Sequence, residues 1–126
     1  MDITPQVAED LQVVRKYDAT GFDISGVRHE GSVLIFPGET RPWSFSGSID
    51  TLQADDFGDV FAANPPVEIL LIGTGSAFSM VSADLRQTLR EKGLGVESMD
   101  TGAACRTYNV LLGEERQVAA ALLPGA

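Results

Sequence analysis

The feature that most constrains the fold is a change of pattern near residue 65. After this point, three short apolar runs alternate with two stretches in which apolar residues recur at helical spacing. The apolar runs are residues 68–72, 96–99 and 118–123. This strand, helix, strand, helix, strand order predicts three adjacent parallel strands joined by right-handed crossovers. The last run has no polar alternation, so we expect both of its faces to be covered.

Capping residues stand where the two helices should begin and end. Ser82 can cap the first helix, and Gly93 can end it. Asp100 or Thr101 can cap the second helix, which should run to about Leu112.

The second helix is apolar around most of its circumference. At helical spacing, only Arg106, Asn109 and Gly113 form a narrow polar stripe. A helix of this kind is either buried in its own core or packed against a second protein. The sequence leaves both possibilities open.

The first half of the chain has the features of an antiparallel meander. Short apolar segments at residues 13–17, 22–24 and 33–36 are separated by turn signals such as Ser25-Gly26. Trp43 and Phe45 stand two apart, which predicts one face of a further strand. Residues 55–61 have helical spacing, with acids in the first turn.

Together these patterns predict an α/β fold with three layers. We expect a mixed central sheet with a parallel βαβαβ C-terminal half, and an antiparallel β layer from the N-terminal half attached to it. A length of 126 residues suits one domain, with residues 1–11 as a poorly ordered terminal segment.

Charge and composition exclude several classes of partner. Eighteen acidic residues face nine basic ones, giving a net charge of −9 that repels nucleic acid and anionic membrane surfaces. The longest apolar runs are far shorter than the ~20 residues that span a bilayer, so we do not expect an integral membrane protein. A single cysteine and no signal peptide predict a cytoplasmic location.

A glycine-rich turn directly follows the first apolar run. Its residues are Gly73, Thr74, Gly75 and Ser76. Open α/β sheets bind ligands at this end of a strand, where exposed backbone N–H groups can hold an anion. The dinucleotide fingerprint is incomplete, because Phe78 occupies the place of the third glycine. The segment is therefore either a tight turn or a site for a small anion or a nucleotide-like ligand.

A second group of polar residues lies at the next strand end and in the following helix. Glu97, Asp100 and Arg106 can form an ion pair and a helix cap, or they can act on a ligand. We expect Arg106 to pair with one of the two carboxylates, because an unpaired buried charge is costly. Thr101 and Asn109 complete the candidate residues for binding a ligand or partner.

Cysteine and metal chemistry are not expected. Cys105 lies near a helix start beside Arg106, which would lower its pKa, but the only histidine, His29, is in the other half of the chain. We expect a buried, inert thiol. No group of histidine, cysteine and acidic residues has the spacing of metal ligands, so we predict no metal and no cofactor.

Four segments together resemble a widespread family of small uncharacterised proteins that includes mitochondrial complex I (NADH:ubiquinone oxidoreductase) assembly factor three. These segments are EILLIGTG (68–75), GLGVESMDT (93–101), ACRTYNVL (104–111) and ERQVAAAL (115–122). The resemblance extends over residues 12–123. Members of the family often have glycine at the position of Glu115.

The resemblance implies a mixed sheet with an added β layer, no established enzymatic activity, and protein partners. We therefore predict a non-enzymatic binding or assembly module that assists the biogenesis of a respiratory or other membrane complex. Its partners would be subunits of that complex or another assembly factor. The alternative is a ligand-binding or enzymatic domain that uses residues 73–76 with Glu97, Asp100 and Arg106. A cysteine-based redox protein is the third hypothesis and the least favoured of the three.

Overall fold

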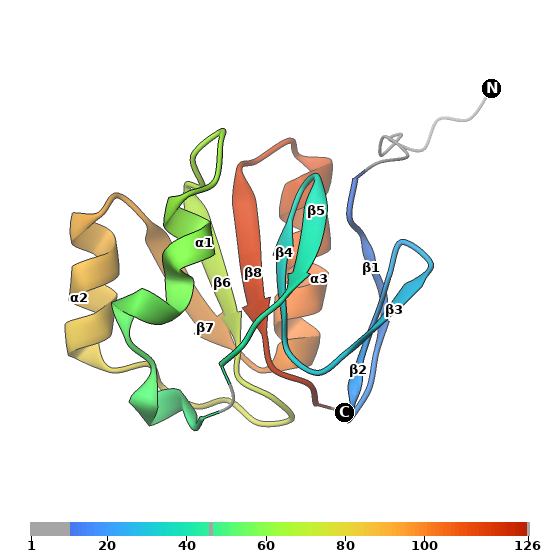
Figure 1. The fold of residues 1–126 in the computed structure, drawn as a ribbon, viewed down its shortest axis with the longest axis horizontal. Coiled ribbons are helices and arrows are strands. Elements are labelled where there is room, and N and C mark those ends of the chain that lie inside the picture. Colours follow the sequence, from blue (N-terminus) through green and yellow to red (C-terminus); the bar gives the residue numbers. More distant parts are fainter. Residues whose placement is uncertain (1–10, 46, 126) are drawn as a thin grey trace.

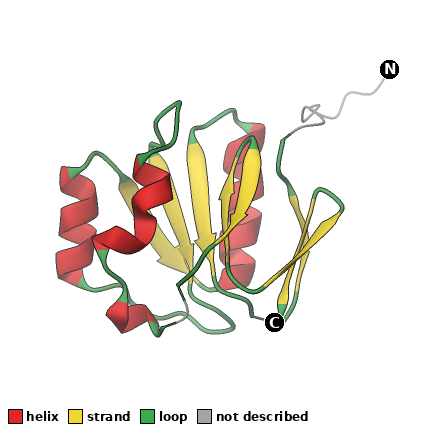
Figure 2. Ribbon diagram, in the orientation of Figure 1, coloured by secondary structure: helices red, strands yellow, loops and turns green. Residues whose placement is uncertain are grey.

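The computed structural model describes residues 11–45 and 47–125. Its centre is a five-stranded mixed sheet in the order β5-β4-β8-β6-β7 (Figures 1 and 2). This sheet contains β4 (Val33–Phe36), β5 (Glu39–Pro42), β6 (Ile69–Gly73), β7 (Gly95–Met99) and β8 (Val118–Leu122). A smaller antiparallel sheet contains β1 (Val14–Tyr17), β2 (Gly21–Ile24) and β3 (Val27–Glu30). The helices are α1 (Gly58–Phe61), α2 (Ala83–Glu91) and α3 (Thr101–Gly113), and two 3₁₀ turns, η1 (Ile49–Thr51) and η2 (Ala54–Phe57), precede them.

The predicted fold class is confirmed. β6 pairs in parallel with both β7 and β8, as the alternation of strands and helices predicted. Every residue of β8 is buried, which explains its lack of polar alternation. Both predicted helix caps are present, because Ser82 accepts the Leu85 N–H and Asp100 accepts the Ala103 N–H. Of the predicted terminal segment 1–11, residues 1–10 lie outside the described residues.

The segment 33–36 belongs to the central sheet rather than to the N-terminal meander. β4 pairs antiparallel with β8, with Val33 opposite Leu122, and this pairing makes the sheet mixed. All four residues of β4 are buried. A strand without a polar face is stable only where both faces of its sheet are covered, and the central sheet provides that position.

The predicted strand through Trp43 and Phe45 is wrong. β5 ends at Pro42; the Trp43 N–H still donates to the Ser32 carbonyl, and the Trp43 side chain is buried in the core. The indole N–H of Trp43 donates to the Asp56 carbonyl at 2.8 Å, and its ring lies 5.6 Å from that of Phe57 between centroids. Burial of a large aromatic side chain with its polar atom satisfied therefore decides the path of the chain here.

The two faces of the central sheet pack against different apolar clusters. Helices α1 and α2 lie over one face, and α3 lies over the other (Figure 1). α3 packs against β6 and β8 and also against β1, so it is enclosed between the two sheets. Burial in the protein's own core therefore accounts for most of the apolar circumference of this helix, with Val110 as an exposed exception.

Glu115 occupies a backbone conformation that favours glycine. Its φ is +62°, and it follows α3 in a Schellman motif, where the Arg116 N–H donates to the Leu111 carbonyl at 3.1 Å and the Glu115 N–H to the Leu112 carbonyl at 3.0 Å. A side chain in this region costs about 1 kcal/mol. The glycine that members of the family resembled by this sequence often have at this position therefore has a conformational reason.

We expect Glu115→Gly to stabilise the fold by about 1 kcal/mol, because it removes this backbone strain. The melting temperature should rise by ~4 °C in thermal unfolding followed by circular dichroism. Glu114→Gly is the matched control, since Glu114 has a φ of −89°, and glycine there should lower stability. A melting temperature of Glu115→Gly at or below that of the wild type would contradict the strain argument.

Candidate functional site

The glycine-rich turn of residues 73–76 is held by the first residue of α3. Thr101 is fully buried, and its hydroxyl accepts the Gly75 N–H at 2.9 Å and donates to the Leu123 carbonyl at 2.6 Å. The Thr101 N–H donates to the Gly75 carbonyl at 2.8 Å. Gly73 is buried and Ser76 is exposed. One threonine therefore joins the turn after β6, the start of α3 and the end of β8.

The two central backbone donors of this turn, those of Thr74 and Gly75, are already used inside the protein. The Thr74 N–H donates to the Met99 carbonyl at 2.9 Å, and the Gly75 N–H donates to the buried hydroxyl just described. The Thr74 hydroxyl donates to the Ala77 carbonyl at 2.7 Å and accepts the Ser79 N–H at 3.1 Å. An anion would have to displace these bonds. The geometry therefore supports a tight structural turn, and φ of +98° explains the glycine at position 75.

The polar residues at the end of β7 are separate from one another. Asp100 accepts the Ala103 N–H at 2.9 Å and so serves as the N-cap of α3. Glu97 is exposed on β7. Within residues 11–45 and 47–125, neither carboxylate forms an ion pair with Arg106.

The prediction that Arg106 pairs with Glu97 or Asp100 is wrong. Gly102 lies next to both Arg106 and Tyr17, the last residue of β1, since a Cβ added at Gly102 would lie 3.3 Å from Arg106 Nη1 and 3.0 Å from Tyr17 Cζ. The guanidinium therefore lies on the flank of α3 that faces β1. Glu97 lies at the edge of the central sheet, away from that flank. Arg106 is exposed, so its charge is hydrated and needs no carboxylate partner.

Asn109 joins α3 to the small sheet. Its Oδ1 accepts the Val14 N–H at 3.0 Å, and its Nδ2 donates to the Val14 carbonyl at 2.8 Å. The side-chain amide thus pairs with β1 as the backbone of a neighbouring strand would. Sequence spacing could not reveal this role, because the two residues lie 95 positions apart.

Cys105 is buried, as predicted. Burial raises the pKa of its thiol to about 12, and this effect outweighs the opposing influence of Arg106. Only a very small fraction of thiolate exists near neutral pH, so the thiol lacks the ionised form that reacts.

Cys105 should therefore react with an alkylating reagent at least about a hundredfold more slowly in the folded protein than free cysteine does at the same pH. Mass spectrometry of timed samples measures this rate. In denaturant the rate should rise to that of free cysteine. A native rate equal to the denatured rate would show that the thiol is accessible and ionised.

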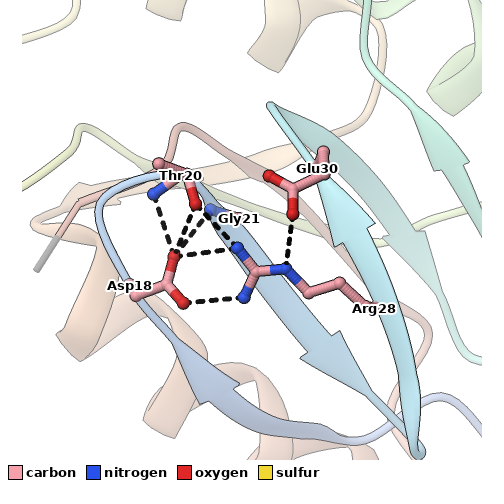
Figure 3. Close-up of polar contacts among 5 residues, drawn as sticks. All are labelled: Asp18, Thr20, Gly21, Arg28 and Glu30. Atoms are coloured by element: carbon pink, nitrogen blue, oxygen red, sulfur yellow. Dashed lines mark hydrogen bonds and ion pairs between the residues drawn. The ribbon is translucent and has the colours of Figure 1, made fainter.

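A polar network that the sequence did not predict joins β3 to the turn after β1 (Figure 3). The Arg28 guanidinium donates to both oxygens of Asp18, at 2.7 and 3.0 Å, and to Glu30 at 2.9 Å. Asp18 also accepts the N–H groups of Thr20 and Gly21. The hydrogen bond from Arg28 is the main reason that the pKa of Asp18 lies well below its usual range. The carboxylate is fully occupied in fixing this turn, and the Asp18 carbonyl in addition accepts the N–H of Gly125.

A groove of about 470 Å³ lies at the opposite end of the central sheet from the 73–76 turn. It lies between the β4–β5 turn, the loop before β6 and the start of β8, and its wall includes Phe36, Pro37, Pro65, Val67 and Val118. None of the nine candidate residues lines it. Its only sequence signal was the pair of proline-containing turns, which indicate loops but no particular ligand.

Within the described residues, no three histidine, cysteine or acidic side chains are placed to hold a metal ion. None of the helices there has both the length and the apolar character needed to cross a membrane.

Comparison with known proteins identifies relatives over most of the chain. Assembly factor 3 of the NADH dehydrogenase (ubiquinone) 1 alpha subcomplex from Homo sapiens is 32% identical over 117 residues, which cover 93% of this chain and 63% of that protein. The Danio rerio protein of the same name is 32% identical and covers 89% of this chain and 64% of its own length. An uncharacterized protein of Rhodobacter capsulatus is 37% identical over 82% of this chain and 77% of its own. The chain spans less than two thirds of the length of these two assembly factors.

Solved structures share the fold. A crystal structure described as an outer membrane protein from Bartonella henselae has a TM-score of 0.82 at 32% identity and covers 94% of this chain and 98% of that one. A Bordetella pertussis protein described as a Mth938-like domain has a TM-score of 0.78 at 26% identity, over 98% of this chain and 92% of that one. The family model described as "Protein of unknown function (DUF498/DUF598)" matches residues 14–123. The chain therefore belongs to the DUF498/DUF598 family.

Proposed function

We propose that this protein is a non-enzymatic assembly module that binds protein subunits during the biogenesis of a respiratory complex of the NADH:ubiquinone oxidoreductase type. The observation that carries the proposal is the 32% identity to human assembly factor 3 over 93% of this chain. The family match extends over residues 14–123 and so includes both sheets and all three helices.

The described contacts favour binding over catalysis. Thr101, Asp100 and Asn109 all bond to backbone groups of the protein itself, so they are not free to act on a substrate. The Cys105 thiol is buried and un-ionised near neutral pH. Several large apolar side chains on separate elements are exposed and are available for contact with another protein. They are Val27, Phe61, Phe78, Met80 and Val110.

Deletion of the gene from its native host tests the proposal. We expect less intact NADH:ubiquinone oxidoreductase on native gels, together with an accumulation of partial assemblies. NADH-dependent quinone reduction in membranes should fall in proportion to the intact complex, because the protein acts on assembly and not on the reaction.

Re-expression of the wild-type chain should restore the intact complex. A normal amount of intact, active complex in the deletion strain would refute the assembly role. The cytoplasmic location stays a prediction, and fractionation of the native host with an antibody against the chain would test it.

A further inference from the structure

We propose that the open edge of β7 binds an extended segment of a partner protein, which adds to the central sheet as a sixth strand. The segment would alternate apolar and basic residues and place a lysine or arginine beside Glu97. This inference rests on the proposed function, because it names the site and the kind of segment through which an assembly partner would bind.

The backbone of β7 has hydrogen-bonding groups that face away from the sheet. β7 is the last strand in the order β5-β4-β8-β6-β7 and pairs only with β6. The Gly95 N–H donates to the Glu68 carbonyl, and the Met99 carbonyl accepts the Thr74 N–H, both at 2.9 Å. Successive residues of a strand direct their backbone N–H and C=O groups to opposite sides. Since Gly95 and Met99 face β6, Val96 and Ser98 direct their N–H and C=O groups to the open edge. Two donors and two acceptors are thus placed for a guest strand.

β7 has fewer of the features that protect the other strand edges in the described structure. β5 is short, carries Arg41 paired with Asp59, and ends in Pro42. β3 carries two charged side chains, Arg28 and Glu30, which pair with each other on one face of the small sheet.

The edge of β1 is blocked in a different way. The side chain of Asn109 bonds both backbone groups of Val14 there. By contrast, β7 has no proline, no lysine and no break in its five-residue register with β6, and Glu97 is its single charged side chain. Edges with so little protection pair readily with another extended chain.

Side chains around β7 indicate what the guest strand should carry. Glu97 and Met99 lie on the α3 face of the sheet, where the Thr107 hydroxyl contacts Met99 Sδ at 3.5 Å. A basic residue beside Glu97 on this face would form a favourable cross-strand pair. The Thr74 hydroxyl contacts the carbonyl groups of both Met99 and Ala77, so the loop that follows β6 lies next to Met99.

That loop also carries two exposed apolar side chains. Phe78 is 56% exposed and Met80 is 67% exposed. They can anchor apolar residues of the guest that extend past the end of β7.

Charge argues against a second copy of the chain as the occupant. Each copy carries a net charge of −9, so two copies repel each other. The only charged residue of β7 is Glu97, and antiparallel pairing of two β7 edges would bring the two Glu97 side chains close together. A basic segment meets the same surface with attraction instead.

The test uses the full chain and three capped nine-residue peptides. In the first, valine and threonine alternate with lysine. The second replaces each lysine with glutamate, and the third keeps the lysines but replaces each valine with proline, which preserves charge and prevents strand addition. Binding is measured by fluorescence anisotropy. Backbone amide exchange is measured by NMR.

The lysine peptide should bind and slow the exchange of the Val96 and Ser98 amides by at least about tenfold, with little change at Glu97, whose N–H already faces β6. The glutamate and proline peptides should bind at least about tenfold more weakly. Ser98→Pro removes an outward N–H and should weaken binding of the lysine peptide by at least about tenfold. Ser98→Ala keeps that N–H and should bind as the wild type does. Thermal melts establish that both variants are folded.

Three results would overturn the inference. The first is equal binding of the lysine and proline peptides, which would mean attraction by charge alone. The second is no measurable binding of the lysine peptide at about 1 mM. The third is protection of Val96 and Ser98 that rises with protein concentration in the absence of peptide, which would make a second copy the occupant.

The assembly role and the binding site can fail separately. If gene deletion leaves the respiratory complex normal while the peptide adds to β7, the assembly role is wrong and the site stands. If deletion impairs assembly and the folded Ser98→Pro variant restores it fully, the role stands and the site is wrong.

Discussion

Thr101→Val should unfold about 10 °C below the wild type, although valine has nearly the same shape as threonine. The hydroxyl of Thr101 accepts the Gly75 N–H and donates to the Leu123 carbonyl. Valine leaves both backbone groups without this partner, at a cost of about 1–3 kcal/mol each when buried. A combined loss of about 3 kcal/mol corresponds to ~10 °C for a chain of this size.

Thr101→Ser is the matched control, because it keeps the hydroxyl and removes only a methyl group. Its melting temperature should lie much closer to the wild type than that of Thr101→Val. Amide exchange at Gly75 should become faster in the valine variant and stay slow in the serine variant. Equal melting temperatures for the two variants would mean that the hydroxyl bridge adds little to stability.

Local patterns were sufficient to predict the C-terminal half of the fold. The three strand segments, the cap at Ser82 and the cap at Asp100 are signals within a few residues, and the structure has all of them, although only β6 and β8 are largely buried. Parallel pairing then followed from the helices that connect successive strands. The N-terminal half was harder, because its strands choose partners far along the chain. Nothing near residues 33–36 indicates that they pair with β8.

The same limit applies to the candidate site. Thr101 drew attention by its position at a helix start, and Asn109 by its place on the polar stripe of that helix. What each side chain does depends on groups that the sequence places 22 to 95 residues away. The error at Arg106 has the same origin, because nearness in sequence to Glu97 and Asp100 did not predict which flank of α3 the guanidinium occupies. The open edge of β7 is likewise a property of strand order, which only the whole fold determines.

Asn109→Leu should loosen the small sheet more than it loosens the central one. The substitution leaves the Val14 N–H and carbonyl without their partners, which costs about 2–4 kcal/mol in total if both groups stay buried. We expect faster amide exchange at Val14 and through β1, β2 and β3, and a lower melting temperature. Exchange in β6 and β8 should change only through the global loss of stability. Thr107→Val on the same helix is the control, because its hydroxyl makes only a weak contact with sulfur.

Asn109→Asp distinguishes, by pH, the two hydrogen bonds that Asn109 makes to Val14. An ionised carboxylate can accept the Val14 N–H but repels the Val14 carbonyl, whereas the protonated acid can donate to that carbonyl as the native amide does. The introduced carboxyl should therefore have a folded-state pKa above its unfolded value of about 3.9. Relative to wild type, the stability of the Asn109→Asp variant should be greatest below the unfolded-state pKa of this carboxyl and should fall as pH rises through its folded-state pKa. Urea unfolding of both proteins between about pH 3.5 and 7 measures the difference. A stability gap between the two proteins that does not change with pH would show that Nδ2 contributes nothing as a donor to Val14, and that packing alone holds α3 against β1.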